Sequence, residues 1–408
     1  MARSLNSEQQ RTESQHARYR SFQYLEPHVD YLPFELAPEV GRVEPGIVPL
    51  SVDEEARTAR ILAENIAISL HDHTQILPLH VEENWESNRE GRIFTGYEGL
   101  AASGLDVVFE NFLDGMATIT SKMSWKWTDV IHDIGMRYSD WAHQDYVVRA
   151  ATIADLIDAH QTGHLAMVAC LEAATPIENE LDRIDILYGL GVRLMGLVYS
   201  ESNALGSGCR EKNDGGLTQF GERAVVRMNK LGMLIDVSHT GDRTTMEAIL
   251  LSSVPVCISH SAARKLWPIS KAKPDDIIVA CAERGGVIGV EAAPGTSMTE
   301  ELPEHTIDSI MAHFEYCVEI AGIDHVTFGP DTMFGDHSML YQGSHGDLLA
   351  SGSTKYDEVI VPYVKCLENP SEFPNVVRWL VKHGYSDNEI AKVIGGNTIR
   401  LLQQVWAK

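Results

Sequence analysis

The segment Met233-Leu234-Ile235-Asp236-Val237-Ser238-His239 holds the pattern that decides the fold. Its short apolar run is bounded by turn residues, which favours a fully buried strand, and a histidine stands just beyond the strand. The same layout occurs in Ile66-Ala67-Ile68-Ser69-Leu70 before His71 and in Val254-Pro255-Val256-Cys257-Ile258 before His260. We therefore expect polar side chains with chemical roles at the ends of several buried strands.

Strand and helix patterns alternate along the chain from Val52 to the C-terminus. Further strands are predicted at residues 105–109, 165–170, 194–198 and 286–290, and helices at residues 53–64, 141–161, 177–189 and 218–231. Such alternation predicts βαβ units with parallel pairing, and hence an α/β fold. Candidate functional residues at the ends of several different strands favour a (β/α)8 TIM-type barrel, whose chemistry lies at the carboxyl ends of its strands.

Composition excludes several classes of function. The 408 residues are 44% hydrophobic, with no apolar run long enough to cross a bilayer, so we expect a soluble chain without a membrane partner. The formal net charge of −25 argues against nucleic acid as a partner, because a phosphate backbone would be repelled. The six cysteines form no C-x-x-C pair, and no secretory signal is visible, so a cytoplasmic location is predicted.

Two parts are expected along the chain. Residues 1–50 are polar and then proline-punctuated, which predicts an extended arm over the barrel or over a neighbouring subunit, with disorder as the alternative for the first residues. Residues 51–408 would form the barrel. Residues 123–127 and 341–347 are candidate lid segments. Plain surface is the alternative for both, and helix packing explains the two tryptophans of the first segment as well as substrate contact does.

Histidines and carboxylates at the predicted strand ends form a candidate metal site. The candidate ligands are His71, His73, Glu172, His239, His260 and Asp331. Neutral imidazoles with carboxylates suit zinc, and two such cations can share a bridging carboxylate. Each residue alone is more often structural, so their shared position carries the interpretation, which is a metal-dependent hydrolase.

These residues and their surroundings resemble the membrane dipeptidase (renal dipeptidase, peptidase M19) family of binuclear zinc hydrolases, within the amidohydrolase-like barrels. The similarity lies in Ile235–His239, Pro255–Ala262, Pro274-Asp275-Asp276, Gly322-Ile323-Asp324-His325-Val326 with Gly329-Pro330-Asp331, and Gly384–Asn397. It extends over roughly residues 66 to 405, most of the chain.

The resemblance implies roles for individual residues. His71, His73 and Asp331 would bind one zinc, Glu172 would bridge two, and His239 with His260 would hold the second. A hydroxide shared by the two cations would be the nucleophile, and Asp331 would carry its proton to the leaving nitrogen. His325, which stands several residues before its strand ends, is expected to be structural.

The chain also departs from the family pattern. His71-Asp72-His73 stands where the family has His-x-Asp, which replaces an anionic ligand by a neutral one. Tyr199 falls where a substrate-contacting histidine is expected, so it could donate to a developing oxyanion or merely pack at the rim. Lys271, or alternatively Arg264, would stand in for the arginine that binds the substrate carboxylate.

The sequence thus predicts a binuclear zinc hydrolase that cleaves an amide C–N bond in a small molecule. A dipeptide-like compound, an N-acyl amino acid or an aromatic amide is the expected substrate. One alternative is a lactonase or decarboxylase-type lyase that uses the same metals, and another is an inactive binding or assembly protein. A homo-oligomer is expected from the arm and from the resemblance.

Overall fold

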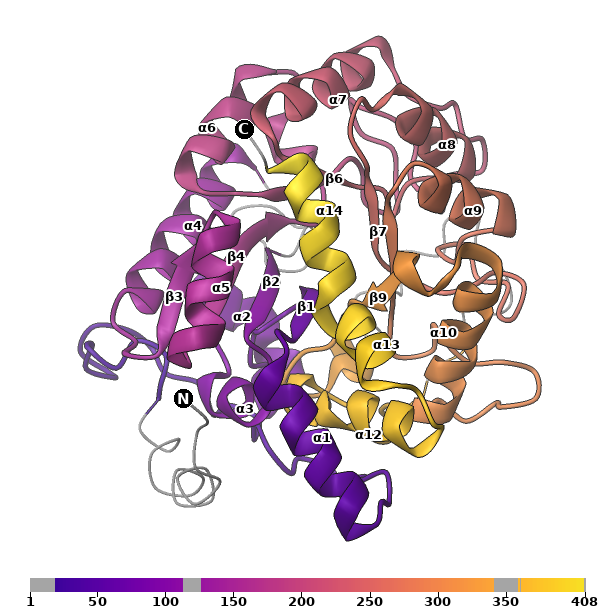
Figure 1. Cartoon of the computed structure of the whole chain (residues 1–408). Coiled ribbons are helices and arrows are strands. Elements are labelled where there is room, and N and C mark those ends of the chain that lie inside the picture. The colour runs from indigo at the N-terminus through magenta and orange to yellow at the C-terminus, as the bar shows by residue number, and fades with distance from the viewer. Residues whose placement is uncertain (1–18, 113–125, 341–358, 360, 407–408) are drawn as a thin grey trace.

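A barrel of parallel strands, surrounded by helices, forms the body of the molecule in the computed structural model (Figure 1). Residues 19–112, 126–340, 359 and 361–406 are described. The strands are β1 (Ile68–Asp72), β2 (Val107–Phe112), β3 (Val147–Ala150), β4 (Leu165–Leu171), β5 (Leu194–Gly196), β6 (Leu234–Asp236), β7 (Cys257–Ser261), β8 (Val287–Val290) and β9 (Val326–Phe328). They pair in parallel in the order β1-β2-β4-β5-β6-β7-β8-β9, and β3 pairs with β4 off this path.

The two ends of this path meet through the segment that follows β9. The backbone N–H of Asp331 donates to the carbonyl of His71 at 3.0 Å, and the N–H of His73 donates to the carbonyl of Thr332 at 3.0 Å. Eight strands therefore enclose a nearly closed barrel, and the predicted (β/α)8 TIM-type fold is confirmed.

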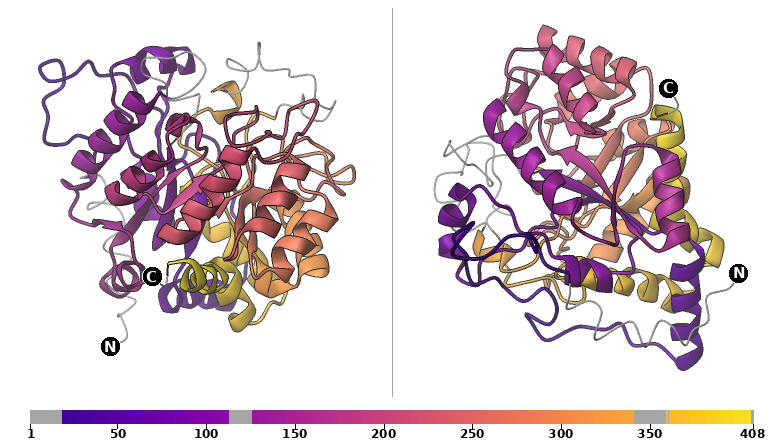
Figure 2. Two further views of the ribbon diagram at one scale, coloured as in Figure 1. Left: turned by 90° about the horizontal axis from the view of Figure 1, so that it is seen from above. Right: turned by 90° about the vertical axis from the view of Figure 1, so that its left-hand side faces the viewer.

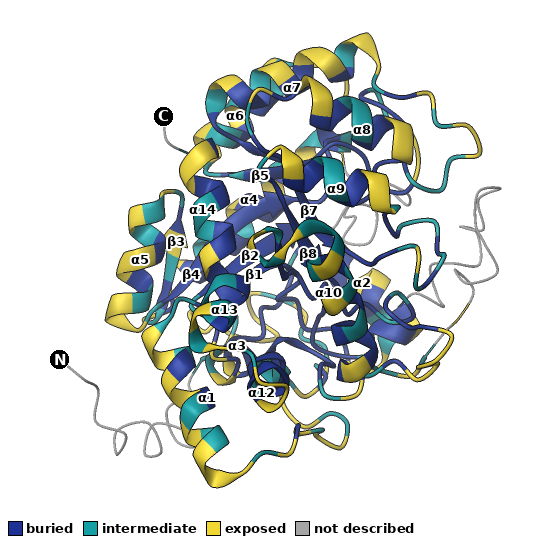
Figure 3. Ribbon diagram, turned by 45° about the vertical axis from the view of Figure 1, so that its right-hand side comes forward, coloured by how far each residue is buried: buried dark blue, intermediate teal, exposed yellow. Residues whose placement is uncertain are grey.

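Helices surround the strands in every view of Figure 2. They are α1 (Val52–Glu64), α2 (Asn84–Arg89), α3 (Tyr97–Ala102), α4 (Trp127–Trp141), α5 (Ile153–Thr162), α6 (Asp182–Leu190), α7 (Gln219–Leu231), α8 (Asp242–Leu251), α9 (Asp275–Glu283), α10 (Ile307–Ala321), α12 (Pro374–Lys382), α13 (Asp387–Ala391) and α14 (Asn397–Val405). Figure 3 shows that the strands are buried, while the outer helices are exposed on one side. This burial explains why the strand sequences are apolar throughout and the helix sequences are amphipathic. In α7, Thr218 caps the first turn, and Ala224, Val225 and Met228 form the buried stripe.

Alternate residues of β4 face opposite sides of the sheet. Val168 and Cys170 of β4 belong to a core with Leu401 and Leu402 of α14, whereas Met167 and Ala169 belong to the core under the outer helices. Both faces of the strands are thus buried, which explains their continuous apolar runs.

One predicted helix is wrong. Residues 141–161 were expected to form a single helix, but α4 ends at Trp141, β3 follows at Val147–Ala150, and α5 begins at Ile153. Val147 and Val148 favour an extended backbone, and Thr152 starts a new helix through a capping box with Asp155. Helix α6 also begins later than predicted, at Asp182.

The described part of the arm, residues 19–50, packs against the barrel of its own chain. The backbone N–H of Phe22 and the hydroxyl of Ser21 donate to Asp140 at 2.6 and 2.8 Å, and Phe22 is buried. Arg42 forms an ion pair with Glu368 near the other end of the chain. The boundary at residue 50 stays a prediction.

The C-terminal helices close the barrel at the amino ends of its strands. A side chain at Gly395 would place its Cβ 2.1 Å from the carbonyl oxygen of Ile66, so this approach requires glycine. The predicted lid segments 123–127 and 341–347 lie outside the described residues, apart from Lys126 and Trp127, and the Arg183 guanidinium lies over the Trp127 ring. Among the described helices, none has both the length and the apolar character needed to cross a membrane.

Candidate metal centre

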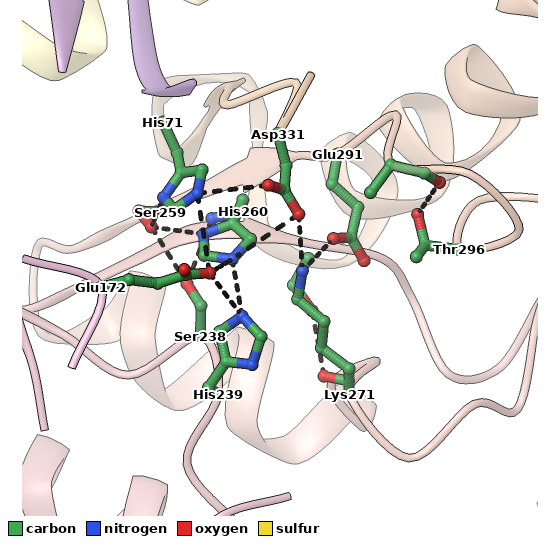
Figure 4. Close-up of polar contacts among 12 residues, drawn as sticks. His71, Glu172, Ser238, His239, Ser259, His260, Lys271, Glu291, Thr296 and Asp331 are labelled. Atoms are coloured by element: carbon green, nitrogen blue, oxygen red, sulfur yellow. Dashed lines mark hydrogen bonds and ion pairs between the residues drawn. The ribbon is translucent and has the colours of Figure 1, made fainter. Parts of the chain in front are cut away.

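The six predicted ligands come from five strand ends on the carboxyl side of the barrel. His71 and His260 lie within the last residues of β1 and β7, and Glu172 follows β4 directly. His73, His239 and Asp331 follow β1, β6 and β9 within three residues. All six are nearly or fully buried and lie in overlapping groups. Figure 4 shows how His71, Glu172, His239, His260 and Asp331 point towards one another.

The first group consists of His71, His73, Glu172 and Asp331, whose donor atoms all lie within 4.8 Å of one another. Asp331 Oδ1 lies 3.3 Å from His71 Nε2 and 3.2 Å from His73 Nε2. Glu172 Oε1 lies 3.8 Å from His71 Nε2, and Glu172 Oε2 lies 4.0 Å from His73 Nε2.

The second group consists of Glu172, His239 and His260. Glu172 Oε1 lies 3.0 Å from His239 Nε2 and 3.5 Å from His260 Nε2, and the two Nε2 atoms are 3.0 Å apart. Glu172 therefore belongs to both groups, which is the position expected of a bridging carboxylate. A third group, His71, Asp236 and His260, overlaps both.

The donor set fits divalent cations. Burial lowers the pKa of His71 to about 4, and it lowers the pKa values of His239 and His260 well below the ordinary value, so these imidazoles are neutral at pH 7. Neutral Nε2 atoms that converge with carboxylate oxygens are the ligands that zinc prefers. If both rings carry their proton on Nδ1, neither Nε2 atom has a hydrogen to donate, and two lone pairs face each other at 3.0 Å. A bound cation would accept both lone pairs.

Charged neighbours shift the pKa values of two other candidate ligands, His73 and Asp331. Burial alone would lower the pKa of His73, but the hydrogen bond to Asp331 and the charges of Glu172, Asp331 and Glu110 raise it to about 9. Burial would raise the pKa of Asp331, but Lys271 and the imidazoles around it hold that pKa well below its ordinary value. A cation at this site therefore meets an ionised Asp331 and competes with a proton for His73.

The Asp331 backbone is also unusual. Its φ of +57° lies in the left-handed region, which a non-glycine residue adopts at a cost of about 1–2 kcal/mol. The hydrogen bond from its N–H to His71 maintains this conformation. Gly329, just before it, permits the close approach, because a Cβ there would lie 2.1 Å from the Ser259 carbonyl oxygen.

Buried polar residues behind the ligands orient them. Ser259 Oγ donates to Asp236 Oδ2 at 2.6 Å and lies 2.8 Å from His260 Nδ1, while Ser238 Oγ donates to Asp236 Oδ1 at 2.6 Å. His73 Nδ1 lies 2.8 Å from the carbonyl of Asn111. Partners of this kind fix the ring tautomer that leaves Nε2 available to a metal.

Lys271 lies at the centre of an ion-pair cluster. Its Nζ is 2.5 Å from Glu291 Oε2 and 3.0 Å from Asp331 Oδ2 (Figure 4). Burial raises the pKa of Glu291, and Lys271 opposes this shift. The structure therefore places Lys271 beside the predicted ligands, already paired with two carboxylates.

Arg264 and Tyr199 have different surroundings. Arg264 forms two hydrogen bonds to Asp242, at 2.5 and 2.8 Å, and donates to the carbonyls of Ser270 and Ala272, so the structure does not bring it into the cluster. The Tyr199 ring stacks on His239 with centroids 4.2 Å apart and planes 19° apart. Tyr199 thus contacts a predicted ligand through its ring, and its proposed role towards an oxyanion stays a prediction.

Asp236 and Glu291 were not predicted as site residues, although their positions at the strand ends could have indicated both. In β4, β6 and β8, inward positions alternate as Cys170, Leu234 and Val287, all members of the interior core. Glu172, Asp236 and Glu291 continue these alternations at the strand ends. By contrast, His325 lies 2.8 Å from the carbonyl of Gly286, a contact of the structural kind expected for it.

Comparisons with known proteins agree with this arrangement. The model of the membrane dipeptidase family (peptidase family M19) matches residues 129–339 and 353–407. The chain is 27% identical over 266 residues to dipeptidase aclJ of Aspergillus oryzae, covering 64% of this chain and 57% of that protein. It is 28% identical over 279 residues to dipeptidase verJ of Clonostachys rogersoniana, covering 68% of this chain and 63% of that protein.

The chain thus spans less than two thirds of the length of these relatives. Among solved structures, an amidohydrolase from Pseudomonas aeruginosa superimposes with a TM-score of 0.70 at 25% identity, covering 86% of this chain and 99% of that one. The family model accounts for more than half of the residues, and the barrel brings the candidate ligands at its strand ends into overlapping groups. The chain belongs to the membrane dipeptidase family.

Proposed function

We propose that this protein is a zinc-dependent hydrolase that cleaves an amide C–N bond in a small molecule and holds two zinc ions. The observation that carries the proposal is the position of Glu172, whose carboxylate is shared by the His71–His73–Asp331 group and the His239–His260 group. A single structural zinc would need only one closed set of four ligands, whereas two sets joined by one carboxylate suit a binuclear catalytic site.

Different residues of the chain would have different roles in the reaction. When bound, two zinc ions supply a water of lowered pKa and polarise the scissile carbonyl. Asp331 is held ionised by Lys271 at Oδ2, so it can accept a proton from the attacking water and deliver it to the leaving nitrogen. Tyr199, whose ring stacks on His239, would donate its hydroxyl hydrogen to the developing oxyanion.

Amine release tests the proposal. The zinc-loaded protein is incubated with a dipeptide, an N-acyl amino acid and an aromatic amide, and the primary amine formed is quantified with and without a chelator. We expect release from at least one amide, abolished by the chelator and reduced at least about 100-fold in Asp331→Asn. Asp387→Asn is the matched control, because Asp387 is an ion-paired carboxylate with Arg57 and Arg60, remote from the cluster.

Each other outcome identifies a competing function. Ring opening of a lactone without amine release would favour the lactonase, and carbon dioxide release without solvent oxygen in the product would favour the lyase. No turnover, together with a metal-poor protein, would favour a binding or assembly role.

A cytoplasmic location and a homo-oligomeric state are also proposed. All six cysteines are free thiols, which is compatible with a reducing compartment. The described part of the arm packs on its own chain through Ser21, Phe22 and Asp140. Native mass measurement tests the oligomer, and fractionation of the source cells tests the location.

A further inference from the structure

Lys271 is the cation expected to bind a substrate carboxylate, yet its charge is already compensated. Its ammonium group lies 2.5 Å from Glu291 and 3.0 Å from Asp331, two carboxylates against one positive charge. A zinc ion on Asp331 would offset that carboxylate, whereas the Glu291 charge would still be opposed mainly by Lys271, with a smaller contribution from Lys273. The other candidate cation, Arg264, is paired with Asp242 outside the cluster.

The exposure of these side chains shows from which side a ligand would approach the cluster. The Lys271 side chain is 12% exposed, compared with 0% for Glu291 and 4% for Asp331. A substrate that reaches the metal ligands from solvent therefore approaches next to Lys271, and it meets a neutral Lys271–Glu291 pair. In Figure 4 this pair lies on the opposite side of His260 and Asp331 from Glu172.

One carboxylate oxygen of Glu291 can accept a further hydrogen bond. Its Oε2 accepts from Lys271, but its Oε1 is buried and has no hydrogen-bond partner among the residues that the structure describes. A buried carboxylate oxygen without a donor is costly, and an N–H group of a ligand would satisfy it. A carboxylate of a ligand has no proton to offer and would be repelled.

We propose that Glu291 determines substrate specificity: it neutralises Lys271 and accepts from an N–H donor, so that the site takes a substrate ending in a carboxamide or similar uncharged group rather than a free carboxylate. This inference rests on the proposed amide hydrolase function and narrows its substrate class. N-acyl amino acid amides and aromatic amides fit such a site, whereas N-acyl amino acids and dipeptides with a free carboxylate do not.

Binding of two matched ligands tests the inference without turnover at the scissile position. 3-Benzoylpropionate and 3-benzoylpropionamide are ketone isosteres of an N-acyl amino acid and of its amide, because a CH2 replaces the scissile N–H. Their dissociation constants for the zinc-loaded protein are measured by calorimetry. We expect the carboxamide to bind at least tenfold more tightly than the carboxylate.

Variants then assign the preference to Glu291. Glu291→Gln removes the charge and keeps the shape, so the preference should shift by at least tenfold towards the carboxylate, whereas Glu291→Asp should keep the native preference. Glu368→Gln is the matched control, because Glu368 is also a buried glutamate in an ion pair, with Arg42, away from the cluster. It should leave the ratio of the two constants unchanged.

Several results would overturn the inference. Tighter binding of the carboxylate by the native protein, equal binding of both ligands, or no binding of either would each do so, and none depends on a variant that folds. A native preference that Glu291→Gln leaves unchanged would also contradict it. The proposed function fails separately, if zinc-loaded protein that binds these ligands releases no amine from any amide.

Discussion

Replacement of Ser259 by alanine should weaken one metal position selectively. Ser259 is fully buried, and its hydroxyl donates to Asp236 at 2.6 Å while it lies 2.8 Å from His260 Nδ1. This geometry keeps the proton of His260 on Nδ1, so that Nε2 is free to bind a cation. After Ser259→Ala, Asp236 Oδ1 still accepts from Ser238 and from the backbone of residue 259. The hydroxyl also lies 3.5 Å from His71 Nδ1, a longer contact than the 2.8 Å to His260 Nδ1, so among the ligands the loss falls mainly on His260.

The size of the effect follows from that contact. Loss of a partner behind a ligating histidine typically costs about 10- to 100-fold in metal affinity, or about 1.4–2.7 kcal/mol. The lost hydrogen bonds should also lower the free energy of unfolding by about 1–2 kcal/mol. Zinc titration of the metal-stripped protein against a competing chelator measures the affinity, and the position held by His239 and His260 should weaken while the other changes less than about threefold.

Ser103→Ala is the matched control for this change. Ser103 is also fully buried and donates to the carbonyl of Leu100 at 2.7 Å, but it lies at the end of α3. It should lose similar stability and bind zinc as the native protein does. Zinc affinity in Ser259→Ala within about twofold of native, or an equal loss in Ser103→Ala, would refute the reasoning.

Two further predictions concern the arm and the rim of the site. Burial raises the pKa of Glu39 from 4.5 to about 7, although the backbone N–H of Gly99 donates to it at 2.8 Å. The folded state therefore binds this proton more tightly than the unfolded state, so stability falls as the pH rises from about 4.5 to 7. Glu39→Gln should raise the free energy of unfolding at pH 8 by up to about 3 kcal/mol, less what solvent screens, and by almost nothing at pH 4. Urea unfolding at the two pH values measures this, and an equal gain at both would contradict it. Tyr199→Phe keeps the stack on His239 but removes the hydroxyl, so kcat on a cleaved amide should fall about 10- to 1,000-fold with little change in thermal stability. An unchanged kcat would leave Tyr199 as a packing residue.

The barrel could be predicted because its strands are buried on both faces. Runs such as Leu165–Leu171 have no polar face, and turn residues mark their ends. The prediction failed at residues 141–161, where the short strand β3 has an exposed position at Arg149 and lacks the continuous apolar run of the others. A strand of that kind looks like part of an amphipathic helix in sequence.

The convergence of the candidate metal ligands was predictable for a similar reason. In a parallel barrel the carboxyl ends of all strands meet on one face, so residues such as Glu172 and His260 converge whatever their separation in sequence. The pairing of Lys271 with Glu291 was not predictable. It depends on how the loop after β7 folds back towards the end of β8, and no spacing rule fixes that path.

The metal content of the purified protein tests the central claim most directly. We predict about two zinc per chain by elemental analysis. Glu172→Ala should lose zinc from both positions because its carboxylate is shared, whereas His239→Ala should lose mainly one; Glu304→Ala, a surface glutamate paired with Lys365, should retain both. One zinc or none in the native protein, or full zinc content in Glu172→Ala, would contradict the account of a binuclear site bridged by Glu172.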